Sequence, residues 1–245
     1  MRSSLAWFLL LLAGCQLRYA SQYPRPDPVA GAAATRVYFV GNSLSYYNDL
    51  PGLLAEMSRA ESAPIVFQAR LVAGQNLQGH WQDGIAVTEI RQGRFDLVVV
   101  QDYSTRPAAD AEGSIESFRR FDREIRGSGA QMVIFENWTR AGRGGDAARL
   151  VETYRRVREY TGARRAPVGE AWERCRRDHP QIRLLADDRH PTPAGTYLAA
   201  CVLFEVIYGR PAPEVTIPGA RLSAERQATL RRVATETIRA TTSRM

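Results

Sequence analysis

The chain has 245 residues, 44% of them apolar and 9% aromatic, which suits one α/β-sized domain with a sizeable core. This composition argues against a disordered or fibrous protein. The net charge of +7 comes from arginine alone, because the chain contains no lysine. The arginines alternate with acids, as in residues 155–159, without an aromatic–basic pattern. We therefore expect solvated helix faces and no nucleic-acid partner.

The first residues have the pattern of an export signal. Arg2 precedes an apolar run at residues 5–12, which is too short to span a bilayer. The sequence Leu-Ala-Gly-Cys at residues 12–15 resembles the lipobox of bacterial lipoproteins, which implies cleavage before Cys15 and lipid attachment to its sulfur. The alternative is a plain secretory signal with an incidental cysteine. Gln16 in place of aspartate points to the outer membrane, by the sorting habit of that family.

Three segments follow from this interpretation. Residues 1–14 are the predicted signal peptide, and residues 15–34 are a lipidated cysteine with a proline- and alanine-rich tether that could form no core. Residues 35–245 form the predicted domain. We expect it in the cell envelope, anchored to a membrane through Cys15. The sequence predicts no oligomeric state.

Strand and helix patterns alternate along the domain. Strands are expected at residues 36–40, 64–72, 95–100, 131–135 and 166–169. Helices are expected at residues 50–60, 84–91, around 115–125, around 150–157, from about 172 to 179, at 193–208 and at 223–239. Alternation of this kind predicts an α/β fold, with a mainly parallel sheet of roughly five strands in a three-layer α/β/α sandwich.

Ligands in such sheets bind outside the carboxyl ends of the strands, so polar residues just after each strand are the candidates. They are Ser43, Gly74, residues 101–104, Asn137, Glu170 and the loop that holds His190. Gly41-Asn42-Ser43 would lift a serine hydroxyl out of the sheet, although this tripeptide is also ordinary turn composition.

A second informative stretch is residues 187–191, Asp-Asp-Arg-His-Pro. Asp187 and His190 are three positions apart, so a turn can bring the carboxylate against the imidazole. Such a carboxylate fixes the tautomer of the ring and stabilises the imidazolium. The alternative is a surface loop with a helix-capping aspartate.

Taken together, Gly-Asn-Ser after strand one, Gly74 after strand two, and Asp-x-x-His-Pro near the end resemble the SGNH (GDSL-like) hydrolase family. The resemblance spans about residues 36–210 and is to a bacterial branch with Gly-Asn-Ser in place of Gly-Asp-Ser. It implies a flavodoxin-like fold, with Ser43 as nucleophile, His190 as general base and Asp187 as the group that orients His190. It also implies that the N–H groups of Ser43 and Gly74 donate to the oxyanion.

The chain departs from the family after strand three. The family places there a Gly-x-Asn-Asp motif whose asparagine is a third oxyanion donor, whereas this chain has Gln101-Asp102-Tyr103-Ser104. Gln101 carries an amide that could replace it, and Asn137 after strand four is a second candidate. Losing one such donor costs roughly 10²–10³-fold in rate, so its identity matters.

Other polar residues have simpler interpretations. His80 either lines the rim of the pocket or is packed inside, and Glu170 and Trp172 are expected to be structural. Cys175 and Cys201 fall in predicted helices, where free buried cysteine is common, although an exported chain could oxidise them. The three histidines lack metal-ligand spacing, so we expect neither a metal nor another cofactor.

The resemblance implies a serine esterase that works through an acyl-enzyme. Short acetyl esters of carbohydrate, as small molecules or polysaccharide, are the substrate class suggested by analogy with the family. One alternative is an O-acetyltransferase with the same three residues. Another is a non-catalytic glycan-binding envelope lipoprotein, which would have no need of Ser43, Asp187 and His190 together.

Overall fold

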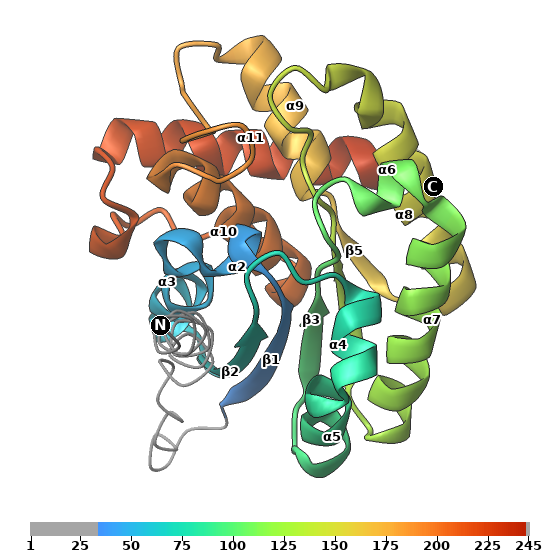
Figure 1. Ribbon diagram of the computed structural model, residues 1–245. Helices are drawn as coiled ribbons and strands as arrows, with labels where there is room; N and C mark the ends of the chain where they lie inside the picture. Colours follow the sequence, from blue (N-terminus) through green and yellow to red (C-terminus); the bar gives the residue numbers. More distant parts are fainter. Residues whose placement is uncertain (1–33, 244–245) are drawn as a thin grey trace, which may run out of the picture.

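The structure is a computed structural model that describes residues 34–243. Its centre is one sheet of five strands, all parallel, in the order β2-β1-β3-β4-β5 (Figure 1). The strands are β1 (Thr35–Gly41), β2 (Ile65–Leu71), β3 (Leu97–Val100), β4 (Gln131–Phe135) and β5 (Arg164–Ala166).

Helices connect the strands and continue beyond the last one. They are α2 (Ser43–Tyr46), α3 (Leu50–Met57), α4 (Leu77–Asp83), α5 (Ile85–Gln92), α6 (Arg106–Ala109), α7 (Ala111–Gly127), α8 (Ala147–Thr161), α9 (Val168–Asp178), α10 (Pro193–Tyr208) and α11 (Ala224–Thr242). Short 3-10 helices lie at Tyr47–Asp49, Ser58–Ala60, Gly144–Asp146 and Pro218–Ala220. None of the helices within residues 34–243 is long and apolar enough to cross a membrane.

Two apolar cores lie on opposite faces of the sheet, because successive strand side chains point to opposite faces. Val37 and Phe39 of β1 pack with α3, α9, α10 and α11, whereas Tyr38 and Val40 pack with α4, α5, α7 and α8. All four residues of β3 are buried, as expected for a central strand covered on both sides. The predicted three-layer α/β/α sandwich is confirmed, and Figure 1 shows the helices on both sides of the sheet.

The fifth strand was misplaced by sequence pattern. It covers Arg164–Ala166, whereas residues 166–169 were expected, and Val168 already begins α9. β5 is an edge strand, and its two arginines find partners around it: Arg165 pairs with Glu136 and Glu170, and Arg164 donates to carbonyl oxygens of α10. Pro167 sits just before the first turn of α9, where its missing N–H costs nothing.

The order of the strands creates a crevice. The chain passes from β1 to β2 on one side and continues through β3 on the other, so the connections diverge at the carboxyl ends of β1 and β3. Val40 pairs with Val100 at that edge. The turn that holds Ser43 and the loop of residues 101–104 therefore leave neighbouring strands at the same level.

Both cysteines of the domain lie in its interior. Cys175 and Cys201 are both free and buried, so no disulfide joins them. Burial raises the pKa of the Cys201 thiol to about 12, which keeps it neutral. The predicted signal peptide, Cys15 and nearly all of the tether lie outside the described residues.

Candidate active site

Ser43 lies where β1 ends and α2 begins. Asn42 is the N-cap of α2, and its Oδ1 accepts a hydrogen bond from the N–H of Leu44 at 3.2 Å. This cap starts a helix directly after the strand and presents Ser43, which is 8% exposed, at the edge of the sheet. The local structure therefore matches the predicted role of Gly-Asn-Ser as a turn that lifts the serine.

Asn42 also explains why this position carries an amide. Its Nδ2 donates to the carbonyl oxygens of Gln75 (2.9 Å) and Asp102 (3.3 Å). Its Oδ1 accepts from Nε2 of Gln101 at 3.1 Å. A carboxylate could cap the helix equally well but has nothing to donate to the two carbonyl oxygens. The amide thus ties the loops after β2 and β3 to the nucleophile turn.

Asp187 and His190 meet within one turn. Oδ1 of Asp187 accepts from the N–H groups of Arg189 (2.8 Å) and His190 (2.7 Å), and Oδ2 lies 2.6 Å from Nδ1 of His190. These hydrogen bonds to His190 and Arg189 hold the pKa of the Asp187 carboxyl well below its ordinary value. Because Asp187 is ionised, Nδ1 of His190 carries the proton and donates it.

The same ring reaches Ser43. Nε2 of His190 lies 3.1 Å from Oγ of Ser43, 147 positions away in the sequence. With the proton on Nδ1, Nε2 accepts the hydrogen bond from the serine hydroxyl. Tyr47 stacks on the imidazole, with 4.1 Å between ring centroids and 5° between planes. The structure thus brings Ser43, His190 and Asp187 into one hydrogen-bonded triad.

Two aromatic rings support the His190 loop from below. Trp138, just beyond β4, donates from Nε1 to the carbonyl oxygen of Arg189 at 2.9 Å. It stacks on Trp172 of α9 with 3.9 Å between centroids, and both rings are buried. Glu170 is bound to Arg165 at 2.8 Å. Glu170 and Trp172 therefore have the structural contacts expected of them.

A cavity of about 230 Å³ opens in front of the triad. Ser43, Tyr47, Gly74, Ser104 and His190 are among the residues that line it. Gly74 has φ = +69°, a conformation in which a side chain would be strained, and this turn brings the chain after β2 into the wall. The structure therefore places the predicted oxyanion donors Ser43 and Gly74 in one cavity.

Gln101 does not line this cavity. Its side chain is buried, and Nε2 donates to the carbonyl oxygen of Asp102, to Oδ1 of Asn42 and to Oδ1 of Asn137 (3.2 Å). Oε1 accepts from the N–H of Asn42 and from Oγ of Ser45 at 3.2 and 3.0 Å. The side-chain amide of Gln101 therefore uses its hydrogen bonds within the protein, where it connects the loop after β3 to the turn that carries Ser43.

The side-chain amide of Asn137 is also hydrogen-bonded within the protein. Its Nδ2 donates to the carbonyl oxygens of Asp102 (3.0 Å) and Tyr103 (3.2 Å). The residue lines a different cavity. Neither residue predicted as the third oxyanion donor therefore faces Ser43 in this structure.

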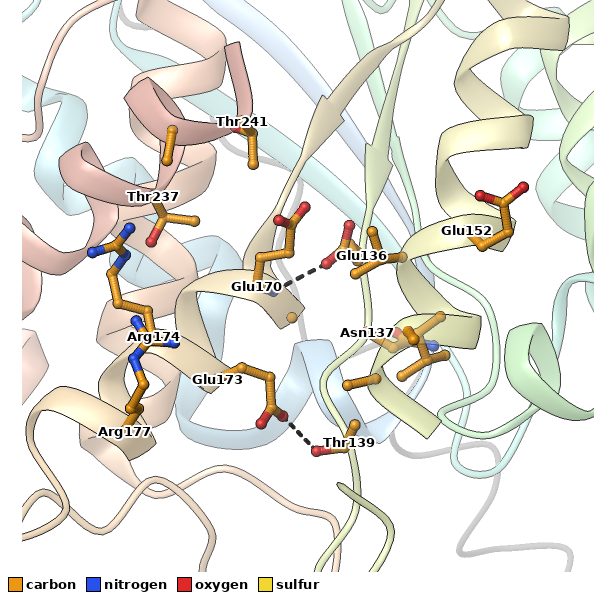
Figure 2. Close-up of a pocket in the computed structure, with 16 residues that line it drawn as sticks. Glu136, Asn137, Thr139, Glu152, Glu170, Glu173, Arg174, Arg177, Thr237 and Thr241 are labelled. Atoms are coloured by element: carbon orange, nitrogen blue, oxygen red, sulfur yellow. Dashed lines mark hydrogen bonds between the residues drawn. The ribbon is translucent and has the colours of Figure 1, made fainter. Parts of the chain in front are cut away.

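That second cavity is larger, about 430 Å³, and lies between α8, α9 and α11 (Figure 2). Glu136 on its wall accepts from the N–H of Glu170 (3.0 Å) and pairs with Arg165 (2.8 Å). Burial raises the pKa of Glu136 to about 8. None of the described residues that line this cavity is a serine, cysteine or histidine. The groups needed for acyl transfer lie at the smaller cavity, so volume does not identify the active site.

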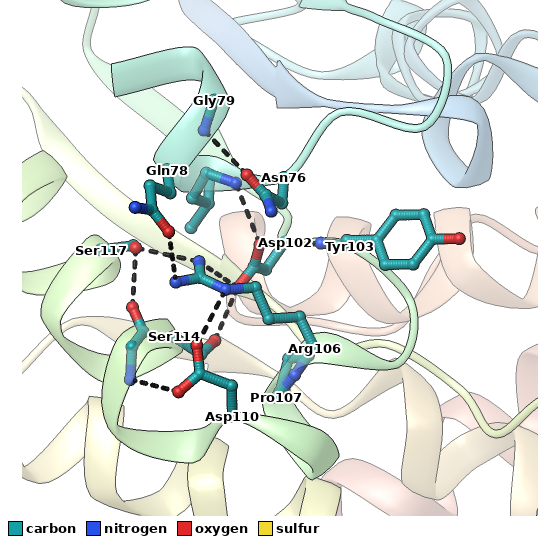
Figure 3. Close-up of polar contacts among 12 residues, drawn as sticks. Asn76, Gln78, Gly79, Asp102, Tyr103, Arg106, Pro107, Asp110, Ser114 and Ser117 are labelled. Atoms are coloured by element: carbon teal, nitrogen blue, oxygen red, sulfur yellow. Dashed lines mark hydrogen bonds and ion pairs between the residues drawn. The ribbon is translucent and has the colours of Figure 1, made fainter. Parts of the chain in front are cut away.

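Sequence reasoning missed a buried cluster next to the triad, at the start of the loop after β3. Asp102 accepts from the N–H groups of Leu77 (3.0 Å) and Tyr103 (2.8 Å) and from Oγ of Ser114 (2.6 Å), and it pairs with Arg106 at 3.4 Å (Figure 3). Burial raises the pKa of Asp102, although each of these four donors acts to lower it. The signal available in the sequence was an acid two residues after an apolar strand.

His80 is packed inside the protein, which was one of its two predicted settings. It is fully buried, and Nε2 donates to the carbonyl oxygen of Gly41 at 2.8 Å. Burial lowers the pKa of His80, so the ring is neutral. Among residues 34–243 there is no group of three histidine, cysteine or acidic side chains placed to hold a metal ion.

No protein-family model matches the chain, and no curated protein matches it. Solved structures do. A candidate SGNH hydrolase from Slackia heliotrinireducens is 26% identical, with a TM-score of 0.59 over 71% of this chain and 99% of its own. A DUF4886 family protein from Bacteroides uniformis is 17% identical, with a TM-score of 0.69 over 84% and 95% of the two chains. An acetyl xylan esterase is 11% identical, with a TM-score of 0.56 over 70% and 99%.

The chain therefore has the fold of the SGNH hydrolases, enzymes that act on ester bonds, and the predicted resemblance is confirmed at that level. Assignment to a lipoprotein branch with Gly-Asn-Ser stays a prediction.

Proposed function

We propose that this protein is a serine esterase that works through an acyl-enzyme. The observation that carries the proposal is the hydrogen-bonded triad of Ser43, His190 and Asp187. It stands at the crevice where an α/β sheet of this topology binds its ligands. A binding module would have no use for a serine paired with an oriented imidazole, so the triad argues against a non-catalytic role.

The first half of the reaction transfers the acyl group to the protein. Oγ of Ser43 attacks the ester carbonyl while Nε2 of His190 takes the serine proton. The ionised Asp187 stabilises the imidazolium that forms. The N–H groups of Ser43 and Gly74 donate to the oxyanion of the tetrahedral intermediate. His190 then returns the proton to the leaving alcohol oxygen, and the acyl-enzyme remains.

The second half repeats these steps with water. His190 removes a proton from the water as it attacks the acyl carbonyl, and Ser43 is released with the proton that His190 gives back. An O-acetyltransferase would differ only in using a sugar hydroxyl in place of water.

The proposed substrates are short acyl esters, above all acetyl esters of carbohydrate. The cavity of about 230 Å³ is small, and aromatic rings of Tyr46, Tyr47 and Tyr103 help to line it. One structural neighbour is an acetyl xylan esterase, which supports a carbohydrate ester by analogy.

The proposed setting is the cell envelope, with the protein anchored through a lipid on Cys15. Only the sequence pattern of residues 12–15 supports this part. Expression with radiolabelled palmitate tests it: the wild type is expected to incorporate label and Cys15→Ala to incorporate none. Equal labelling would contradict the anchor without affecting the proposed chemistry.

Hydrolysis of 4-nitrophenyl acetate tests the enzymatic proposal. We expect the purified protein to release nitrophenol with saturation kinetics, and Ser43→Ala and His190→Ala to lose roughly 10⁴–10⁶-fold in kcat. A fluorophosphonate probe should label the wild type and fail to label Ser43→Ala. The esterase proposal is wrong if the wild type and both variants share one background rate.

Product analysis separates hydrolysis from transfer. With a xylo-oligosaccharide added as acceptor, an esterase still forms acetate, whereas a transferase forms acetylated sugar at the expense of acetate.

A further inference from the structure

We infer that the hydroxyl of Ser104 is the third donor to the oxyanion. This inference rests on the proposed esterase function and adds a residue to its machinery. It starts from a gap in the site: Ser43 and Gly74 line the cavity, but neither amide expected to join them, Gln101 or Asn137, does so.

The position of Ser104 follows from the register of the sheet. Val40 of β1 pairs with Val100 of β3, and both strands end there, at the crevice. Ser43 comes three residues after Val40 and Ser104 four residues after Val100. Ser104 therefore stands beside the nucleophile turn, and it lines the same cavity as Ser43, Gly74 and His190.

The side-chain hydroxyl of Ser104 is buried but not hydrogen-bonded to any described residue. The residue is only 3% exposed, and its Oγ has no hydrogen-bond partner among the described residues. Buried hydroxyl groups almost always have a partner, because an unpaired one forfeits its hydrogen bonds to water. Because Ser104 lines the reaction cavity, its unpaired hydroxyl has a direct explanation, which is that the partner arrives with the reacting substrate.

The loop that carries Ser104 is fixed on both sides. On one side, Asp102 binds the N–H of Tyr103 together with Ser114 and Arg106 in the buried cluster of Figure 3. In that view the ring of Tyr103 points away from the cluster. On the other side, the N–H of Arg106 donates to the carbonyl oxygen of Tyr103 at 3.1 Å and closes a turn over Ser104.

Such a fixed donor suits the chemistry. An oxyanion hole works because its donors are held in place before charge develops, so that no reorganisation is needed during the reaction. A serine hydroxyl supplies one O–H that rotates to its acceptor, and a hydrogen bond to a negatively charged oxygen is stronger than one to a neutral carbonyl. Ser104 therefore favours the transition state over the bound ester.

The test measures kcat, KM and unfolding temperature for the wild type, Ser43→Ala, Ser104→Ala and Ser58→Ala with 4-nitrophenyl acetate. Ser58 is the matched control. It is a fully buried serine at the opposite end of the sheet, and its hydroxyl donates to the carbonyl of Ala55 and accepts from the N–H of Ile65, both at 2.8 Å.

We expect Ser104→Ala to lose roughly 10²–10³-fold in kcat at a similar KM. Its unfolding temperature should stay level or rise, because the hydroxyl that is removed has no protein partner. Ser58→Ala should show the reverse, with a lower unfolding temperature and an unchanged kcat.

Each other outcome has a distinct meaning. If the wild type has no activity above Ser43→Ala, the esterase proposal itself fails. If the wild type is active and Ser104→Ala keeps its kcat within about threefold, the inference about Ser104 is overturned and the esterase stands. The inference is also overturned if Ser104→Ala loses kcat together with unfolding temperature, since the hydroxyl is then structural.

Discussion

Asp187 and Asp102 flank the same crevice in opposite settings. The side chain of Asp187 is 51% exposed, and its hydrogen bonds come from residues two and three positions away. The side chain of Asp102 is fully buried, and its donors include Leu77 and Ser114, which lie 25 and 12 positions away. The pKa of the first carboxyl is lowered by its donors, and that of the second is raised by burial.

The contrast between these two carboxylates shows two roles that a polar group can have in one site, a catalytic role and a structural one. Asp187 stays ionised near water and acts on a single ring, so it serves the proton transfer. Asp102 joins segments that are distant in sequence and keeps the loop after β3 in place. Substitution of the first should cost rate, and substitution of the second should cost stability.

Of the substitutions that test this contrast, the largest effect is expected at Asp187. Asp187→Asn should lower kcat by roughly 10³–10⁴-fold, because an amide neither fixes the tautomer of His190 nor stabilises its imidazolium. The unfolding temperature should hardly change, since the side chain is half exposed. Steady-state kinetics and thermal melting together check this. An active variant, or one with a markedly lower unfolding temperature, would place Asp187 in the structural class.

Asp102→Ala should give the opposite pattern. We expect a loss of about 3–5 kcal/mol in the free energy of unfolding, because Arg106 and three other donors lose a buried acceptor. Urea denaturation measures it. Ser117→Ala on the same helix as Ser114 is a suitable control, with an expected loss of about 1 kcal/mol. Equal losses in the two variants would show that Asp102 does not organise the cluster.

Glu136 extends the contrast to a third carboxyl, which faces Arg165 and Glu170. Burial raises its pKa in the folded protein from the ordinary value of 4.5 to about 8. The folded state therefore binds this proton more tightly, and the resulting stability is complete below about pH 4.5 and is lost as the pH rises through 8. The free energy of unfolding should fall by at most about 1.4 kcal/mol per pH unit in this window.

Glu136→Gln should remove most of that slope. Asp102 leaves a residual slope in both proteins, because its pKa is also raised. Chemical denaturation at pH 5, 6, 7 and 8 measures both curves. Parallel curves would mean that Glu136 is ionised throughout and held by Arg165.

Asn42→Asp tests the link between the two regions. The carboxylate would face the carbonyl oxygens of Gln75 and Asp102 in place of an amide that donates to them. We expect a loss of about 1–3 kcal/mol in stability, which should shrink at acidic pH as the new carboxyl takes up a proton. A variant as stable as the wild type at pH 7 would show that the loops rearrange without cost.

The smallest effect is expected at Tyr47. Its ring lies flat against the imidazole of His190, and an aromatic pair contributes about 0.5–1.5 kcal/mol. Tyr47→Ala should therefore lower kcat/KM by roughly 2–10-fold, while Tyr47→Phe, which keeps the ring, should retain it. If the two variants lose activity equally, the hydroxyl rather than the stacked ring is what counts.

Periodicity was enough to predict most of the fold. The strand at Gln131–Phe135 and the helix at Pro193–Tyr208 begin and end where their patterns predict. α4 was missed because Leu77–Asp83 is short, contains a glycine and turns a histidine toward the core beside Leu77 and Trp81, so its apolar pattern is weak. The triad residues could be proposed because their order and spacing are features of sequence, and the structure brings them within hydrogen-bond distance.

The third donor could not be found in this way. Gln101 has the right chemical group at the right strand end, but its amide turns inward to Asn42 and Asn137. The direction in which a side-chain amide points depends on neighbours from other strands. It cannot be read from the spacing of residues in the sequence. Ser104 stands out only in the folded structure, where its Oγ is buried and has no hydrogen-bond partner among the described residues.

The span of 147 residues between Ser43 and His190 also bears on how the protein is made. The serine emerges early in synthesis, whereas its base follows only after all five strands have been made. Contacts of such long sequence separation form late and slowly in folding. A partly synthesised or partly folded chain therefore carries a serine without its base. Ser43 becomes reactive only when folding brings His190 against it.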